Sequence, residues 1–469
     1  MSDKVYVFFQ TDDFKKKVIV EYALFIIGVK SEIVDKSSDI KLSEVQFYYG
    51  DTRPENYEGV FIQKKETIQP TDVHAILNNS VTLSKNIQID IVQLLEVFIC
   101  DTVNDPSSLN KYDELDRLTY ETSYQFKNNF ADLPVANVII RYLEEHIDAF
   151  YQFQKIPLWP GKKKCVIILS HDVDEPIKHA NLFNYQAFPK RPADLIKHYY
   201  HLLRLTKNFV TDKNKNDYWL FDEIVDFEKL LGFKSTFFFA VVDKWQGDAH
   251  PYDVNYKISN KVFAEAFKKI RDNGSEIGLH ASFNAYKSTE RFIAEKNKLE
   301  QTAQINITGL RHHYWHMAKN YRDTLYMHDA AGFEYDSSVA FNFNIGFRNN
   351  IALPYPVFHP ATNRFLKMME IPSFCMDGHV FYKHEDVEKG FKEITEAVSR
   401  IKKCGGLGAI DWHVRTSFPK NVKYKNWGTL YVKILNYLAQ DNEIWVTSCN
   451  EVMNWFKERK EKLTVLKCL

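Results

Sequence analysis

Residues 165–174 read CVIILSHDVD, and the fold class follows from the way this pattern recurs along the chain. The first part of the segment is apolar and rich in β-branched residues, which is typical of a buried strand. The strand runs directly into Asp172 and Asp174. Because side chains two apart on a strand point to the same face, both carboxylates are expected to face one space at the end of the strand.

Further short apolar runs, rich in β-branched and aromatic residues, occur at 235–242, 276–280, 305–310, 365–372, 408–412 and 444–448. Helical patterns lie between several of them, at 193–206, 222–231, 261–273, 289–303 and 387–403. Parallel strands need such crossover connections, so the alternation predicts an α/β fold whose sheet is closed or nearly closed into a distorted β/α barrel. In barrels of this type the catalytic groups lie at the C-terminal ends of the strands.

A break in this pattern precedes the barrel. Residues 156–164 combine prolines, a glycine and a lysine cluster, which indicates a linker or a domain-entry loop. We therefore predict a smaller α+β domain over residues 1–155 and the barrel over residues 164–469. Within the smaller domain the patterns predict strands at 45–49 and 60–63 and an amphipathic helix at 138–150. The segments 18–29 and 91–98 fit a helix or a strand. No chemical motif in this domain selects between gating the barrel, recognising part of a substrate and mediating oligomerisation.

The composition excludes several classes of protein. Among 469 residues, 61 Lys and Arg balance 61 Asp and Glu, so the chain lacks the basic excess that nucleic acid or an anionic membrane surface requires. Its 45% hydrophobic and 26% charged residues are typical of globular proteins. The 6 cysteines are dispersed, no signal-peptide pattern opens the chain, and the best apolar run, 22–29, is too short to span a membrane. We expect a cytoplasmic protein without a transmembrane segment.

Polar residues follow several of the predicted strands directly. His280 ends one strand, Arg311 and a pair of histidines follow the next, and His413 ends another. A neutral imidazole binds a divalent metal, and an arginine holds a carboxylate by charge-assisted hydrogen bonds. Each residue alone fits an ordinary core or loop position equally well. Together with Asp172 and Asp174 at the same end of a barrel, they predict a metal-dependent active site.

With these residues, the second part of the chain resembles the polysaccharide deacetylase family (the NodB homology domain, carbohydrate esterase family 4). It is most similar to the cytoplasmic-type branch with a His-Asp-Val-Asp first motif, over roughly residues 164–452 and in the family's motif order. The resemblance implies that Asp172 is the general base and that Asp174 binds the metal. In the second motif, His-Ser/Thr-x-x-His, His280 matches the first ligand histidine, whereas Asn284 stands in the place of the second.

The later motifs imply the remaining roles. Arg311 matches the arginine that buttresses the base, and Tyr314 matches the tyrosine of the same motif, with His313 where a proline is usual. We expect Tyr314 to contact the substrate. His413 matches the catalytic histidine, and Asp336 is the best match for the acid that orients it.

The asparagine at a ligand position bears on the identity of the metal. The resemblance implies a divalent ion, with zinc favoured, but a carboxamide oxygen suits harder ions, so manganese, cobalt and magnesium are alternatives. Three possibilities are open: Asp174, His280 and a replacement such as His312 or His313 hold the ion, the ion is bound loosely, or the site has lost it. We favour a bound ion, because Asp174 and His280 would otherwise have no evident role.

The resemblance implies hydrolysis of the acyl amide of an N-acylated sugar. In the absence of an export signal, the expected substrate is a nucleotide-linked or lipid-linked precursor of a surface polysaccharide. Arg348 is a candidate for binding a substrate phosphate or carboxylate, with a salt bridge as the alternative. Trp412 is a candidate for stacking on a sugar ring, with core packing as the alternative. Other functions also fit: an amide or ureide hydrolase with a non-sugar substrate, or an inactive carbohydrate-binding or scaffold protein, which Asn284 would favour.

Overall fold

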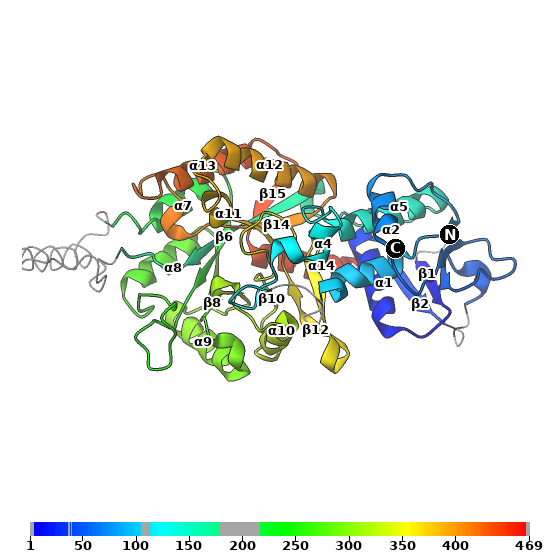
Figure 1. Ribbon diagram of the computed structural model, residues 1–469, viewed down its shortest axis with the longest axis horizontal. Coiled ribbons are helices and arrows are strands. Elements are labelled where there is room, and N and C mark those ends of the chain that lie inside the picture. The colour runs from blue at the N-terminus through cyan, green and yellow to red at the C-terminus, as the bar shows by residue number, and fades with distance from the viewer. Residues whose placement is uncertain (1–3, 36–37, 39, 105–111, 179–215, 466–469) are drawn as a thin grey trace, which may run out of the picture.

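The computed structural model describes residues 4–35, 38, 40–104, 112–178 and 216–465. The helix predicted at 193–206 lies outside these residues. Two sheets organise the rest of the chain, and Figure 1 shows the smaller one, near the N-terminus, beside the larger one.

The larger sheet contains β6 Cys165–Val173, β7 Ser235–Phe239, β8 Glu276–Ala281, β9 Gly309–His312, β10 Tyr335–Asp336, β11 Tyr355–His359, β12 Arg364–Glu370, β13 Ser373–Met376, β14 Leu407–Asp411 and β15 Ile444–Thr447. The strand order is β11-β12-β10-β9-β8-β7-β6-β14-β13, and β15 pairs with β6. All of these pairs are parallel except β11 with β12. Figure 1 shows that the sheet curls. In the strand order of the described residues, β11 and β13 are the two ends and do not pair, so the predicted distorted β/α barrel is confirmed as an open one.

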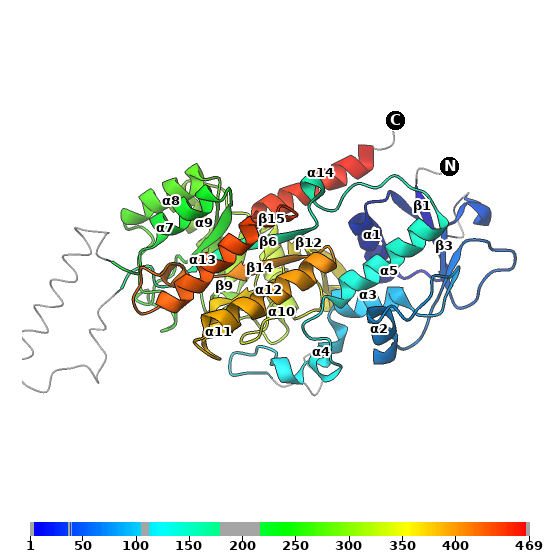
Figure 2. The ribbon, with the colours of Figure 1, turned by 90° about the horizontal axis from the view of Figure 1, so that it is seen from above.

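Helices lie between these strands along the chain: α7 Phe221–Leu230, α8 Val262–Asp272, α9 Thr289–Ala303, α10 Tyr321–Ala330, α11 Asp377–Phe381, α12 Val387–Lys403 and α13 Lys425–Ala439. A further helix, α14 Cys449–Val465, follows the last strand. The predicted helices at 289–303 and 387–403 have the expected bounds. Each begins where it does because a side chain, Ser288 or Asp386, caps its N-terminus with a hydrogen bond. Figure 2 shows α12 and α13 lying side by side across the outer face of the sheet. Among the described residues, no helix is both long and apolar enough to cross a membrane.

The smaller sheet has the order β2-β1-β3-β4-β5, formed by β1 Val5–Phe9, β2 Ser31–Val34, β3 Phe47–Gly50, β4 Val60–Gln63 and β5 Asn86–Ile87. Its main helices are α1 Phe14–Ile27, α2 Pro70–Leu77, α3 Ile91–Ile99 and α5 Val135–Phe150, followed along the chain by the barrel. The strands at 45–49 and 60–63 and the helix at 138–150 are confirmed, and both ambiguous segments are helices. All strand pairs are parallel, so the expected α+β class is wrong here. The reason is that α1 and α2 serve as crossovers, which parallel pairing requires.

The two sheets share one apolar core. Helix α14 runs from the barrel toward the smaller sheet (Figure 2), and its Val452 and Phe456 belong to the same buried cluster as Leu24 of α1. Arg459 of α14 is fully buried and donates hydrogen bonds to the carbonyls of Ile26 and Ile156, each at 3.1 Å. The N-terminal part is therefore fixed against the barrel by packing and by a buried guanidinium group.

Candidate active site

The predicted polar residues gather at one edge of the larger sheet. Strand β6 carries Asp172 and leads into Asp174, β8 carries His280, β9 carries Arg311, and His413 follows β14. The strands that bring them are parallel, so their carboxyl ends meet at the same edge, which we call the barrel mouth.

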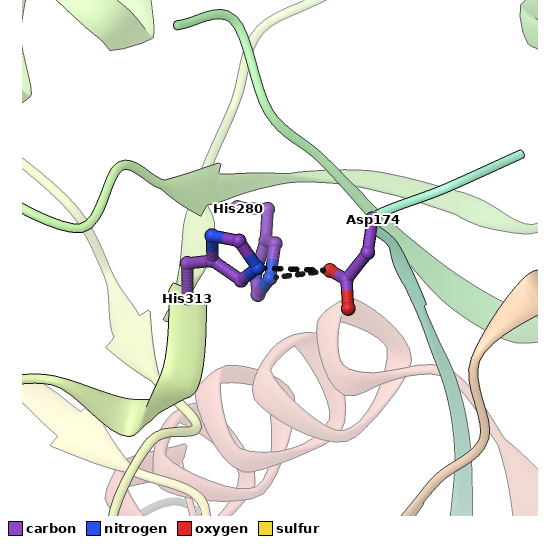
Figure 3. Close-up of side chains that lie close together, drawn as sticks. All are labelled: Asp174, His280 and His313. Atoms are coloured by element: carbon purple, nitrogen blue, oxygen red, sulfur yellow. Dashed lines mark ion pairs between the residues drawn. The ribbon is translucent and has the colours of Figure 1, made fainter. Parts of the chain in front are cut away.

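Asp174, His280 and His313 form a compact group. One oxygen of Asp174, Oδ1, lies 3.1 Å from Nε2 of His280 and 3.5 Å from Nε2 of His313, and Figure 3 shows both rings directed at it. Both histidines are buried, and the possible ligand atoms of the three residues lie within 4.8 Å of one another. Burial lowers the pKa of His313 to about 4, so this imidazole is neutral near pH 7 and has a free lone pair.

These three residues fit a divalent metal ion. Within the part of the chain that the structure describes, Asp174 Oδ1 and His280 Nε2 are buried yet make no hydrogen bond of acceptable geometry. The other ring nitrogen of His280, Nδ1, lies 3.1 Å from the carbonyl oxygen of Arg311. Burial lowers the pKa of His280, but the charges of Asp172 and Asp174 outweigh it and raise that pKa. Metal binding needs the neutral ring, in which Nδ1 donates its proton to this carbonyl and the Nε2 lone pair faces the centre of the group. One carboxylate with two imidazoles is a ligand set of catalytic zinc sites, with a further position left for water or substrate.

The third member of this group, His313, is one of the replacements considered above, and the ligand role of Asn284 stays a prediction. Asn284 begins the short 3₁₀ helix Ala285–Lys287 after β8, whereas His313, one of the replacements left open, comes from the end of β9. The next two residues, Tyr314 and Trp315, have φ angles of 59° and 50°. This double left-handed turn is rare for bulky residues and places His313 beside His280, with ring centroids 4.9 Å apart.

His312, the other replacement considered, points elsewhere. Its Nε2 lies 3.1 Å from Nε2 of His328 on α10, and both rings are buried. Because neighbouring strand residues face opposite sides, only one of the two consecutive histidines faces the mouth.

Asp172 is held by a buried arginine. Nη1 of Arg311 donates to Asp172 Oδ1 at 3.0 Å and to Ser170 Oγ at 2.8 Å, and Nε donates to the carbonyl of Ser337 at 2.9 Å. The guanidinium group is completely buried. The other carboxylate oxygen, Asp172 Oδ2, lies 3.7 Å from His280 Nε2. Asp172 therefore presents one oxygen to the metal group while the other is fixed in place.

A further acid, Asp411, was missing from the predicted site. It lies on β14, two residues before His413, and its Oδ1 is 3.2 Å from Nη1 of Arg311. Burial and then the charge of Asp172 raise the pKa of Asp411 to about 8, so Asp411 is protonated near pH 7. Asp172 is then the acid that forms an ion pair with Arg311. One sequence signal could have identified Asp411: it lies two residues before His413, and residues two apart on a strand share a face.

His413 is oriented by Asp377, the first residue of α11. Its Nδ1 lies 3.0 Å from both oxygens of Asp377, and its backbone N–H donates to Oδ2 at 3.1 Å. Thr416 also donates to Asp377 Oδ2, at 2.5 Å. The far nitrogen of the ring, Nε2, lies 3.0 Å from Oδ2 of Asp174. Burial lowers the pKa of His413, but Asp377 and Asp174 outweigh it and hold that pKa well above the usual value, so the ring is cationic.

The expected partner of His413, Asp336, was wrong. Asp336 accepts hydrogen bonds from the backbone N–H and the hydroxyl group of Ser338, at 2.7 and 2.8 Å, and interacts with Glu370 of β12. Burial raises its pKa to about 6. The reason is topological: β10 pairs with β9 and β12, whereas the acid that reaches His413 follows β13, the neighbour of β14.

Of the three residues predicted to contact the substrate, one is exposed at the mouth and two are buried. Tyr314 is 46% exposed at the mouth, and burial followed by the charge of Asp174 raises its pKa, so its hydroxyl group is a donor. Arg348 is buried, 3.7 Å from Asp101 of the N-terminal part, so its predicted contact with substrate is wrong. Trp412 is also wrong, because its side chain is completely buried and packs against Tyr431 on the face opposite to that of His413.

Comparisons with known proteins add the following. No protein-family model and no curated protein matches the chain. A solved structure from Mycobacterium smegmatis, named as a polysaccharide deacetylase, is 15% identical, with a TM-score of 0.42, and covers 64% of this chain and 93% of its own. The allantoinase PuuE is 12% identical, with a TM-score of 0.42 and coverages of 65% and 94%. The peptidoglycan deacetylase PdaC from Bacillus subtilis is 12% identical, with a TM-score of 0.32 and coverages of 65% and 96%.

Proposed function

We propose that this protein is a metal-dependent hydrolase that removes the acyl group from an N-acylated sugar. The observation that carries the proposal is that a metal-binding group, a carboxylate and an oriented imidazole lie together at the barrel mouth. The metal-binding group contains Asp174, which lies 3.0 Å from the oriented imidazole of His413. It also contains His280, which lies 3.7 Å from the arginine-held carboxylate of Asp172. A metal group, a base and an acid around one space are the parts that amide hydrolysis needs.

The residues that would hold the metal are Asp174, His280 and His313. If a divalent cation is bound there, it would lower the pKa of a bound water and would polarise the amide carbonyl group. Two imidazoles and one carboxylate favour zinc over harder ions, provided that His313 rather than Asn284 is the third ligand, as we propose. Manganese, cobalt and magnesium remain alternatives to be tested.

Asp172 is the proposed general base. Its free oxygen faces the metal-binding group, so a water placed there is within reach for removal of its proton. Arg311 keeps the other oxygen in place through a charge-assisted hydrogen bond of 3.0 Å. The raised pKa of Asp411 favours its neutral form, which adds no second negative charge beside the base.

His413 is the proposed general acid. Its Nδ1 is fixed by Asp377, so the proton that faces the mouth is the one on Nε2. Breaking an amide releases an amine, which is a poor leaving group until it is protonated, and the cationic ring supplies that proton. General acid–base steps of this kind contribute about 10²- to 10⁴-fold to the rate.

The sugar part of the substrate is proposed from the motif resemblance of Asp172, Asp174, His280, Arg311 and His413 to polysaccharide deacetylases. We propose a cytoplasmic substrate, an N-acetylated sugar linked to a nucleotide or lipid carrier.

The test is the release of amine by the purified, zinc-loaded protein from N-acetylglucosamine, triacetylchitotriose and UDP-N-acetylglucosamine. We expect turnover of at least one of them. Asp172→Asn should abolish it with metal content unchanged, and Asp272→Asn, which changes an exposed carboxylate of α8, should not affect it. Near-normal turnover of Asp172→Asn, or no amine from any of these sugars with zinc bound, would contradict the proposal.

A further inference from the structure

Several exposed aromatic side chains lie on connections that follow strands of the larger sheet. The described chain has large exposed aromatic residues on loops that follow β7, β9, β10 and β13, namely Trp245, Tyr252, Tyr314, Phe343 and Tyr382. A group of exposed rings beside a candidate active site fits a ligand surface.

We propose that Tyr252 and Tyr314 form an aromatic platform that binds a pyranose ring next to the metal-binding group. Tyr252 is 51% exposed and Tyr314 46%, and their ring centroids lie 5.2 Å apart with an angle of 31° between the planes. Tyr314 directly follows His313, so a ring bound there is adjacent to the reacting centre. The inference rests on the proposed function and adds the residues that recognise the sugar.

The platform has a rigid base. Phe283 is buried beneath the two tyrosines, with ring centroids 5.2 Å from Tyr252 and 5.9 Å from Tyr314, both edge-on. The ring of His250 stacks on Phe283 at 4.1 Å and 17°. Asp253, which is buried, accepts from the backbone N–H groups of Phe283 and His250, at 2.8 and 2.7 Å. Rings that are already fixed lose little entropy when a ligand binds.

The N-terminal part of the chain fixes the second tyrosine. Nη1 of Arg117 donates to the carbonyl oxygen of Tyr314 at 2.6 Å, and Nε donates to Asp113 at 2.8 Å. Tyr314 and Trp315 both have left-handed backbones, a conformation that persists only when neighbouring groups hold it. Arg117 is therefore a positioning residue for the platform.

The chemistry of this surface selects a sugar. A tyrosine offers an apolar ring face together with a polar hydroxyl group at its edge. A pyranose has the matching character, with C–H bonds on its faces and hydroxyl groups around its rim.

The test measures binding separately from turnover. In the Asp172→Asn background, triacetylchitotriose is titrated into zinc-loaded protein by calorimetry. Tyr252→Ala should raise Kd about five- to tenfold, the size of a lost aromatic contact, whereas Tyr252→Phe, which keeps the ring, should stay within about twofold. Phe14→Ala, which removes an exposed ring of α1, is the matched control and should leave Kd unchanged.

In the protein with Asp172 intact, Tyr252→Ala should raise KM for triacetylchitotriose with little change in kcat. Equal binding by Tyr252→Ala and its parent, or no saturable binding by the parent, would overturn the platform. Turnover with an unchanged KM in Tyr252→Ala would overturn the platform alone and leave the hydrolase proposal standing. If sugar binding depends on Tyr252 but neither the parent nor any variant turns the sugar over, the platform proposal would stand and the hydrolase proposal would be contradicted.

Discussion

His413 Nδ1 lies 3.0 Å from both oxygens of Asp377, an acid 36 residues earlier in the sequence and on a different element. The backbone N–H of His413 and the hydroxyl group of Thr416 bind the same carboxylate. This contact gives the imidazole one orientation and one charge state, which are the properties that a general acid needs.

Replacing Asp377 with asparagine should impair the acid. The positive charge on His413 is stabilised by Asp377, so Asp377→Asn lowers the pKa of His413 and leaves less of the cationic form. We expect kcat to fall about 100-fold or more. Activity that depends on a protonated His413 is lost as the pH rises through its pKa, so the alkaline limb of the kcat/KM profile should move to lower pH. An alkaline limb at the same pH as in the parent would contradict the assignment.

Asp336→Asn should give the opposite pattern. Asp336 contacts Ser338 and Glu370 rather than His413, so kcat should stay within a few-fold of the parent value. Its pKa in the fold is raised from 3.8 to about 6, so its ionisation destabilises the fold as the pH rises between those values. The Tm of the variant should therefore depend less on pH in that window. A loss of kcat as large as that of Asp377→Asn would restore Asp336 as the partner of His413.

Asp411→Asn should be tolerated at neutral pH. Asp411 is already protonated there, because its pKa is raised from 3.8 to about 8, and an amide replaces a neutral carboxyl group of the same shape. The folded protein binds this proton more tightly than the unfolded chain, so the free energy of unfolding falls as the pH rises from about 4 to about 8. Thermal unfolding across this range should show a smaller decline for Asp411→Asn. An equal decline in both proteins would show that Asp411 is ionised in the fold.

The ligand assignment predicts unequal effects of two neighbouring substitutions. His313→Ala removes a nitrogen that lies 3.5 Å from Asp174 Oδ1 and should weaken zinc binding about 100-fold or more in a chelator competition assay. Asn284→Ala should leave zinc affinity within about twofold. The reverse order would return Asn284 to the ligand position that the motif pattern gives it.

The barrel was predictable because each of its strong elements carries its own signal. Residues 165–174 combine a buried strand with an abrupt polar end, and the helices at 289–303 and 387–403 have both a clear period and a capping residue. Asp377 was missed because β13 and α11 have 4 and 5 residues, too short for a period of either kind.

Other parts of the site depend on features that single-sequence patterns do not contain. The placement of His313 rather than His312 at the mouth depends on the left-handed turn at Tyr314 and Trp315, which has no glycine to signal it. The parallel pairing of the smaller sheet depends on α1, whose residues are buried on most sides and fit a strand pattern equally well.

The most direct test of the central claim is anomalous diffraction at the zinc edge from crystals of the zinc-loaded protein. The account predicts one strong peak bounded by Asp174 Oδ1, His280 Nε2 and His313 Nε2, at the ligand distances of about 2.0–2.2 Å that zinc takes. A peak coordinated by Asn284 without His313, or no peak at this position in zinc-saturated crystals, would contradict it.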